Sequence, residues 1–191
     1  RLKDERNTAS VSESDDVDGS VSREIQERTR DFENAQDSHD LDHLYQEAAV
    51  ADKELQTATN DIAGATGGEA KFPPGLKGRE RAVEKTMGEN DGDFSRLTDL
   101  SRSSIQYESM ADLQSGLAQI DGQFDVVRIK DRFETPAPGG YRDMLLNVRM
   151  SNGHIVEIQL HLKSILDVKS GRGHEIYERT RSLAAIPETE G

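Results

Sequence analysis

Residues 126–162 read VVRIKDRFETPAPGGYRDMLLNVRMSNGHIVEIQLHL, and this stretch decides the fold class. It contains three runs of alternating apolar and polar residues separated by turn-forming residues, which predicts three adjacent β-strands. Because successive side chains of a strand point to opposite faces, every run has an apolar face and a charged face. The predicted apolar faces comprise Val127, Ile129 and Phe133; Met144, Leu146 and Val148; and His154, Val156, Ile158, Leu160 and Leu162.

The opposite faces of these runs carry an unusual mixture of side chains. A sheet with one polar face is commonly a sheet with one face in water. Here an acid, amides, an aromatic ring and several bases converge, which favours a functional surface. Glu157 stands out, because its neighbours are apolar and a carboxylate there is costly unless it is paired or holds a metal. The predicted polar faces comprise Arg128, Lys130 and Arg132; Tyr141, Asp143, Asn147 and Arg149; and Glu157, Gln159 and His161.

Length and composition limit the classes of protein that the chain can represent. With 191 residues it has room for one domain with a core and an appendage. No apolar run approaches the length of a membrane span, and the absence of cysteine excludes disulfides and thiolate metal sites. The net charge of -13 argues against nucleic-acid binding through a broad basic surface. Because the chain begins with Arg, we expect a fragment or a processed product.

The N-terminal third is expected to be disordered at first and then helical. Residues 1–20 are rich in Ser, Asp and Glu, which predicts a disordered segment. A helix is expected over residues 22–36 with Ser22 as its cap, and a second helix from residue 38 or 40 to residues 64–68. These helices form a predicted N-terminal unit, residues 21–68. His39 and His43 lie four apart on the second helix, and we interpret them as surface histidines.

A basic segment follows the rigid break at residues 72–75. Lys77, Arg81 and Lys85 recur every four residues, which places them on one face of a predicted helix, with Arg79 beside them. Two interpretations stay open: a solvated helix with ion pairs to neighbouring glutamates, or a clamp for a polyphosphate.

The remaining pattern predicts the order of elements around the three strands. We expect a strand over residues 102–107 and an amphipathic helix from residue 110. A further helix is expected after residue 163, broken at residues 171–173 and resumed to residue 183. Helices, a strand, a helix, three strands and a helix indicate an α+β fold with a mostly antiparallel sheet.

The sequence resembles the RelA/SpoT-type alarmone synthetase domains, including small or toxin-like variants. The resemblance covers roughly residues 69–181, within a predicted synthetase domain of residues 69–186, and it implies a nucleotidyltransferase-like fold related to DNA polymerase beta. It also implies Mg²⁺-dependent transfer of pyrophosphate from ATP to the 3′-hydroxyl of GDP or GTP. The matching segments, in order, are KGRERAVEK (77–85), DLSR (99–102), KDRF (130–133), GYR (140–142) and EIQ (157–159).

The resemblance implies a role for individual residues. Asp99 and Glu157 match the two acidic positions that bind the metal, and Glu157 would also take the proton of the attacking hydroxyl. Tyr141 matches the aromatic residue that stacks on the acceptor purine. The implied donor-binding residues are Lys77, Arg79, Arg81, Lys85 and Arg102, and the implied acceptor-binding residues are Lys130, Tyr141, Asn147, Gln159 and His161.

Departures from the family pattern fall mainly in the acceptor pocket. Leu145 stands where the family has histidine, and His161 stands where it has arginine; Lys169, His174 and Tyr177 replace a histidine-rich pattern. Three alternatives therefore stay open: synthesis of an adenosine alarmone, pyrophosphorylation of RNA 3′ ends, and a catalytically silent nucleotide-binding module. The resemblance implies a cytoplasmic site of action without a membrane partner. It also permits delivery as the C-terminal part of a secreted toxin, with an immunity protein as partner.

Overall fold

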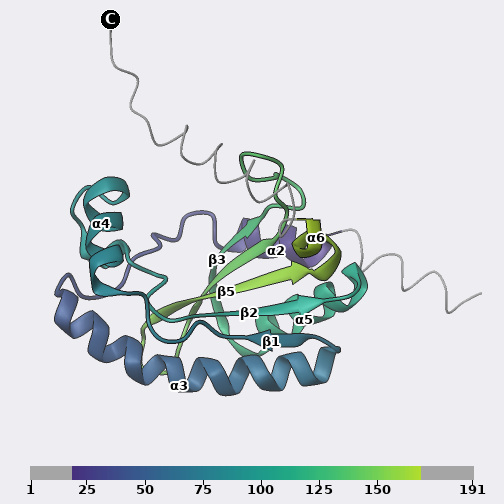
Figure 1. Ribbon diagram of the computed structural model, residues 1–191, viewed down its shortest axis with the longest axis horizontal. Helices are drawn as coiled ribbons and strands as arrows, with labels where there is room; N and C mark the ends of the chain where they lie inside the picture. The colour runs from purple at the N-terminus through teal and green to yellow at the C-terminus, as the bar shows by residue number, and fades with distance from the viewer. Residues whose placement is uncertain (1–18, 169–191) are drawn as a thin grey trace, which may run out of the picture.

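The computed structural model describes residues 19–168, which form one open sheet with helices packed mainly on one of its faces (Figure 1). The expected disorder of residues 1–18, the C-terminal helix beyond residue 168, and Lys169, His174 and Tyr177 lie outside the described residues. No helix of the described part is long and apolar enough to span a bilayer. The elements are α2 (Ser20–Arg28), α3 (Leu41–Thr66), β1 (Glu69–Lys71), α4 (Arg79–Glu89), the 3-10 helix η1 (Phe94–Arg96), β2 (Arg102–Tyr107), α5 (Met110–Gln123), β3 (Asp125–Asp131), β4 (Met144–Arg149), β5 (Ile155–Leu162) and α6 (Lys163–Val168).

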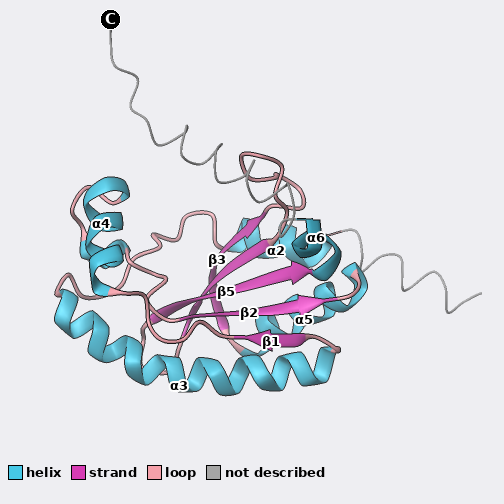
Figure 2. Ribbon diagram, in the orientation of Figure 1, coloured by secondary structure: helices cyan, strands magenta, loops and turns pink. Residues whose placement is uncertain are grey.

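The five strands lie in the order β1-β2-β5-β4-β3 (Figure 2). β2 and β5 are parallel, and the other three neighbouring pairs are antiparallel. The predicted α+β class with a mostly antiparallel sheet is therefore confirmed. The sequence prediction missed β1, because three residues are too short for alternation to distinguish a strand from a loop.

The alternation of the three C-terminal strands is largely confirmed. Met144, Leu146 and Val148 pair with Leu160, Ile158 and Val156, so six apolar side chains share one face. A register shift between Val126 and Arg128 changes the pattern in β3, because an extra residue in one strand reverses the alternation beyond it. As a result Val126, instead of the predicted Val127, joins Ile129 in the main core.

The N-terminal region consists of α2, α3 and the segment that connects them, and both helices pack on the apolar face of the sheet. α3 matches the expected second helix: the Asp40 side chain caps it by accepting from the His43 backbone N–H, and Gly67 ends it with φ 71°. The predicted first helix is wrong at both ends. α2 follows Gly19 and ends at Arg28, and Ser22 is buried, with its hydroxyl 2.7 Å from Asp131 Oδ2 instead of capping the helix. Residues 29–40 form an irregular segment in place of the expected second half of that helix.

The main core lies between the apolar face of the sheet and α2, α3 and α5. A second, smaller cluster joins the first half of α3 to α4 and to the loop before β2. Its members are Leu41, Leu44, Ala48, Ala82, Leu97 and Leu100. This second cluster matters for function, because Leu97 and Leu100 bracket Asp99, and their burial fixes the loop that carries it.

A glycine in α5 makes a close contact that the sequence does not reveal. A Cβ atom on Gly116 would lie 2.1 Å from the hydroxyl of Tyr107, which is fully buried and bonded to Thr66. We expect Gly116→Ala to lower the free energy of unfolding by about 1–3 kcal/mol, although alanine is the better helix former.

The matched control lies in the same helix. Gly122 has no atom within 4 Å of the equivalent position, so Gly122→Ala should be neutral or stabilising by up to about 1 kcal/mol. Urea denaturation of the two variants measures both values. Equal stability of the two variants would show that Tyr107 moves aside at no cost.

Candidate active site

The polar face of the sheet gathers five of the twelve predicted site residues into two lines across the strands. In the first line Arg102, Glu157, Asn147 and Arg128 are successive partners on β2, β5, β4 and β3. The second line comprises Ser104, Gln159, Leu145 and Lys130. Because neighbouring strands lie about 4.8 Å apart, Glu157 stands beside Arg102 and two strands from Arg128.

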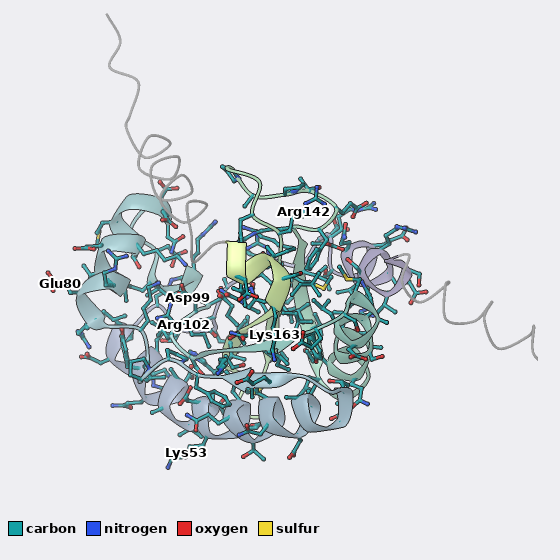
Figure 3. The ribbon with its side chains drawn as sticks, turned by 45° about the vertical axis from the view of Figure 1, so that its right-hand side comes forward. Lys53, Glu80, Asp99, Arg102, Arg142 and Lys163 are labelled. Atoms are coloured by element: carbon teal, nitrogen blue, oxygen red, sulfur yellow. The ribbon has the colours of Figure 1, made fainter. Side chains whose placement is uncertain are left out.

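Asp99 lies in the loop that leads into β2, beside two lysines. Its Oδ2 atom is 2.8 Å from Lys77 Nζ and 2.8 Å from Lys85 Nζ. Its Oδ1 atom is buried and has no hydrogen-bond partner among residues 19–168. Figure 3 shows Glu80 and Lys53 at the periphery of the molecule, away from Asp99. The carboxylate thus has one oxygen neutralised by two cations and one oxygen left over.

The two carboxylates differ in protonation behaviour. Burial alone would raise the pKa of Asp99, but the hydrogen bonds from Lys77 and Lys85 outweigh it and hold that pKa below its usual value. Burial raises the pKa of Glu157, the hydrogen bond from Gln159 opposes this rise, and the charge of Asp99 adds to it. Asp99 therefore carries a stable negative charge, whereas Glu157 is suited to accept a proton.

The donor set of these two carboxylates fits Mg²⁺. In the described part of the chain no three His, Cys, Asp or Glu side chains gather into a preformed metal cage. Mg²⁺ keeps several waters and is usually held by one or two carboxylates together with substrate phosphates. The free Oδ1 atom of Asp99 and the neighbouring carboxylate of Glu157 meet that requirement.

Four of the five predicted donor-binding residues, those of the basic segment, separate into two groups. Lys77 lies before α4 instead of on it, so the predicted helical stripe through Lys77, Arg81 and Lys85 is wrong. Its backbone N–H donates to Leu100 O, which brings it to Asp99 with Lys85. Arg79 and Arg81 are exposed and pair with Asp42 and Glu84. The structure therefore brings two of the four basic residues to the acid, and the other two form surface ion pairs.

Arg128 is a cation of the polar face that was not among the predicted site residues. It shares that face with Lys130, and its charge helps to lower the pKa of Lys130, after the larger effect of burial. The alternation of β3 already placed Arg128 beside Lys130, so the signal was present in the sequence. Lys130 and Arg132 also line a cavity of about 460 Å³ at the edge strand β3, and Gln26 of α2 lines the same cavity.

Three of the five predicted acceptor-binding residues form a chain of hydrogen bonds that ends at Glu157. Tyr141 Oη lies 2.8 Å from His161 Nδ1, and His161 Nε2 lies 3.2 Å from Gln159 Oε1. Gln159 Nε2 donates to Glu157 Oε1 at 2.6 Å. The directions are consistent if His161 carries its proton on Nε2 and accepts at Nδ1. Tyr141 as a whole is only 8% exposed, so its stacking on a purine stays a prediction.

Asn147, also predicted as an acceptor-binding residue, has a structural partner set. Its Nδ2 atom lies within 3.4 Å of Thr98 O and Val156 O, and its Oδ1 atom accepts from Asn34 at 3.0 Å. Asn147 therefore connects the Asp99 loop, β5 and the segment before α3. Its amide is engaged by protein groups from all three.

Lys85 should contribute more to donor binding than an exposed lysine does. Removing a charge-assisted hydrogen bond to phosphate costs about 1.5–3 kcal/mol, so Lys85→Ala should weaken ATP binding roughly tenfold or more. Lys53→Ala on the exposed side of α3 is the control and should leave affinity unchanged. Calorimetric titration of ATP into the three proteins measures the difference. If the three proteins bind ATP with equal affinity, Lys85 does not contact the donor and serves only to neutralise Asp99.

The described chain has the nucleotidyltransferase-like fold of the RelA/SpoT-type alarmone synthetases. The structure is similar to that of the type VI effector Tas1 in complex with its immunity protein, with a TM-score of 0.57, 22% identity and 74% coverage of both chains. It is also similar to small alarmone synthetase 2 of Bacillus subtilis, with a TM-score of 0.54, 20% identity and coverage of 75% and 82%. Small alarmone synthetase 1 of the same organism, bound to its product pppGpp, gives a TM-score of 0.52, 20% identity and coverage of 72% and 86%.

One curated relative matches over much of the chain. It is the (p)ppApp synthetase toxin Tas1 of Pseudomonas aeruginosa (strain UCBPP-PA14), which is 24% identical over 158 residues, or 79% of this chain. The chain spans about a third of the length of that relative, 35%. No protein-family model matches the sequence. The resemblance deduced from the sequence motifs is thus confirmed as a likeness of fold.

Proposed function

We propose that the chain is a Mg²⁺-dependent pyrophosphokinase that transfers pyrophosphate from ATP to the 3′-hydroxyl of a purine nucleotide. The observation that carries the proposal is that two buried carboxylates meet at the start of the paired strands β2 and β5. Asp99, bonded to Lys77 and Lys85, lies three residues before Arg102, and Arg102 pairs with Glu157. Lys130 lies on the same face of the sheet. A surface that only binds a nucleotide does not need two buried carboxylates. Metal-assisted phosphoryl transfer needs them to hold the metal and to take the proton.

Each group has a task in that reaction. The acceptor 3′-oxygen forms a bond to the β-phosphorus of ATP, the bond from that phosphorus to the α–β bridging oxygen breaks, and AMP leaves with the electron pair. Glu157 takes the proton of the attacking hydroxyl, for which its raised pKa suits it. Lys77, Lys85 and Arg102 hold the negatively charged donor. Mg²⁺, held by Asp99 and Glu157, would supply charge neutralisation on the phosphate oxygens.

For the acceptor we propose a guanosine nucleotide, as the sequence motifs imply, with an adenosine nucleotide as the second candidate. The similarity to a protein named as a (p)ppApp synthetase favours the second candidate. His161 at the arginine position and Leu145 at the histidine position concern this choice, because both flank Gln159 on the polar face.

Thin-layer separation of products formed from labelled ATP, Mg²⁺ and one acceptor at a time tests the proposal. GDP, GTP, AMP, ADP, ATP and an RNA with a free 3′ end serve as acceptors. A labelled 3′-pyrophosphorylated nucleotide supports the proposal and identifies the acceptor. If the chain binds nucleotide and Mg²⁺ but forms no product, the proposal is wrong and the chain is a catalytically silent nucleotide-binding module. If product forms only with RNA, the acceptor is an RNA 3′ end instead of a free nucleotide.

The likeness to a type VI effector also motivates a proposal on context. We propose that the chain is the toxic part of a delivered protein, with an immunity protein as its partner. Production of the chain inside bacteria should then stop growth, and Asp99→Asn should relieve the arrest. Normal growth with active enzyme present would contradict a toxic role.

A further inference from the structure

Gln36, in the irregular segment between α2 and α3, ties together the two pieces of chain that carry Asp99 and Glu157. Its Nε2 atom donates to Leu97 O at 3.0 Å and to Ile155 O at 2.8 Å. Its Oε1 atom accepts from the Ile155 backbone N–H at 2.8 Å. The side chain is 5% exposed. Gln36 therefore pairs with Ile155 as a residue of a neighbouring strand would, and it holds Leu97 with the same nitrogen.

The two anchor points have the same spacing to the two acids. Leu97 precedes Asp99 by two residues, and Ile155 precedes Glu157 by two residues. Only two residues of backbone therefore separate each acid from a carbonyl group that Gln36 binds. A change in the distance between Leu97 and Ile155 should therefore change the separation of the two carboxylates.

Other residues hold the rest of the Asp99 loop, so the contribution of Gln36 can be separated from theirs. On the far side of Asp99, Ser101 O accepts from the Glu157 backbone N–H at 3.1 Å, so the loop is tied to β5 there as well. At Thr98, the backbone oxygen and the hydroxyl accept from Asn147 and Asn34 respectively. On the near side of Asp99, Gln36 holds Leu97, and it is the residue that joins this side of the loop to the start of β5.

We propose that Gln36 is a positioning residue that sets the separation of Asp99 and Glu157 for metal binding. This inference rests on the proposed function of the site. An amide is needed because a single side chain must both donate to two carbonyl oxygens and accept from one N–H, which no carboxylate or methionine can do. The segment before α3 then helps to position the site, although no hydrogen bond joins a side chain of residues 29–40 to either carboxylate.

The test compares Gln36→Met with Gln114→Met. Gln114 is also a buried glutamine, 6% exposed, but it lies on α5, and its Oε1 atom has no partner among the described residues. Binding of Mn²⁺ to the purified protein is measured by calorimetry and by electron paramagnetic resonance, and thermal unfolding is recorded for each protein. Loss of an outer hydrogen bond to a metal site commonly costs 10–100-fold in metal affinity. We expect Gln36→Met to raise the Kd for Mn²⁺ about tenfold or more, and Gln114→Met to leave it unchanged.

A second variant covers the case in which Gln36→Met does not fold. Gln36→Asn keeps the amide but is one methylene shorter, so it cannot reach Leu97 and Ile155 together. It should also weaken Mn²⁺ binding. In turnover with Mg²⁺, both variants should lower kcat at saturating metal and leave the KM for ATP near the wild-type value.

The outcomes separate the two proposals. The same Kd for Mn²⁺ in the wild-type chain and in Gln36→Met would overturn the positioning role alone, and a lower melting temperature of that variant would then make Gln36 a purely structural residue. A wild-type chain that binds no Mn²⁺ and yields no product would overturn the proposed function and this role with it.

Discussion

Asp99→Asn is expected to reduce pyrophosphate transfer by about a thousandfold or more. Asparagine keeps the shape of the side chain but lacks the charge that binds Mg²⁺, and a metal contributes several kcal/mol to a phosphoryl-transfer transition state. Lys77 and Lys85 would also lose the anion that lies 2.8 Å from each of them. Initial rates at saturating ATP and acceptor, measured over a range of Mg²⁺ concentrations, check this expectation.

The unfolding temperature must be recorded beside the rate, because the variant also changes the stability of the loop. Leaving two ammonium groups without their shared carboxylate should cost about 1–3 kcal/mol of unfolding free energy. Asp61→Asn on the exposed surface of α3 is the matched control, and it should change neither quantity. Full activity of Asp99→Asn would remove Asp99 from the metal site and leave it a partner of the lysines.

Glu157→Gln is expected to lower kcat by about 10²–10⁴-fold, the range found when a general base is removed. Glutamine can still accept the hydrogen bond from Gln159 Nε2, so the chain from Tyr141 through His161 to position 157 stays intact. The variant therefore removes the charge and the proton acceptor with little change in packing. The KM for ATP should change far less than kcat, because Lys77 and Lys85 remain.

Glu80→Gln provides the control, since Glu80 lies on the exposed periphery of α4 (Figure 3). A rate for Glu157→Gln within a fewfold of wild type would show that another group, or water, takes the proton. A large fall in the melting temperature of Glu157→Gln, with the rate restored by lower temperature, would point to a structural role for the carboxylate.

The sequence predicted β2 at its observed bounds and the alternation of β4 and β5, because alternation depends only on residues within a strand. It also predicted α3 and α5 well, since both combine a polar N-cap with a regular apolar stripe. The failures occurred where a distant contact decided the local structure. Ser22 became a partner of Asp131 instead of a helix cap, and the bulge in β3 moved Val126 into the core.

The candidate site shows the same division. The polar character of Glu157, Gln159 and His161 was evident from parity, and motif order drew attention to Asp99. The position of Lys77 beside Asp99 depends on a backbone bond to Leu100, and Arg79 and Arg81 found partners on the surface. No spacing rule could have separated these four basic residues, because Lys77, Lys85 and Arg79 have partners outside α4, at Asp99 and Asp42. Only the pair of Arg81 with Glu84 is local to the helix.

The sequence by itself determined the two faces of β4 and β5 and the chemistry available on their polar face, because side-chain alternation in a regular strand depends only on residue order. Only the tertiary structure decided which charges meet. The parallel pairing of β2 with β5 places Arg102 beside Glu157, and Gln36 joins Leu97 to Ile155 across 61 and 119 residues of chain. Such contacts depend on the packing of whole elements against a common core, and no local pattern of residues encodes them.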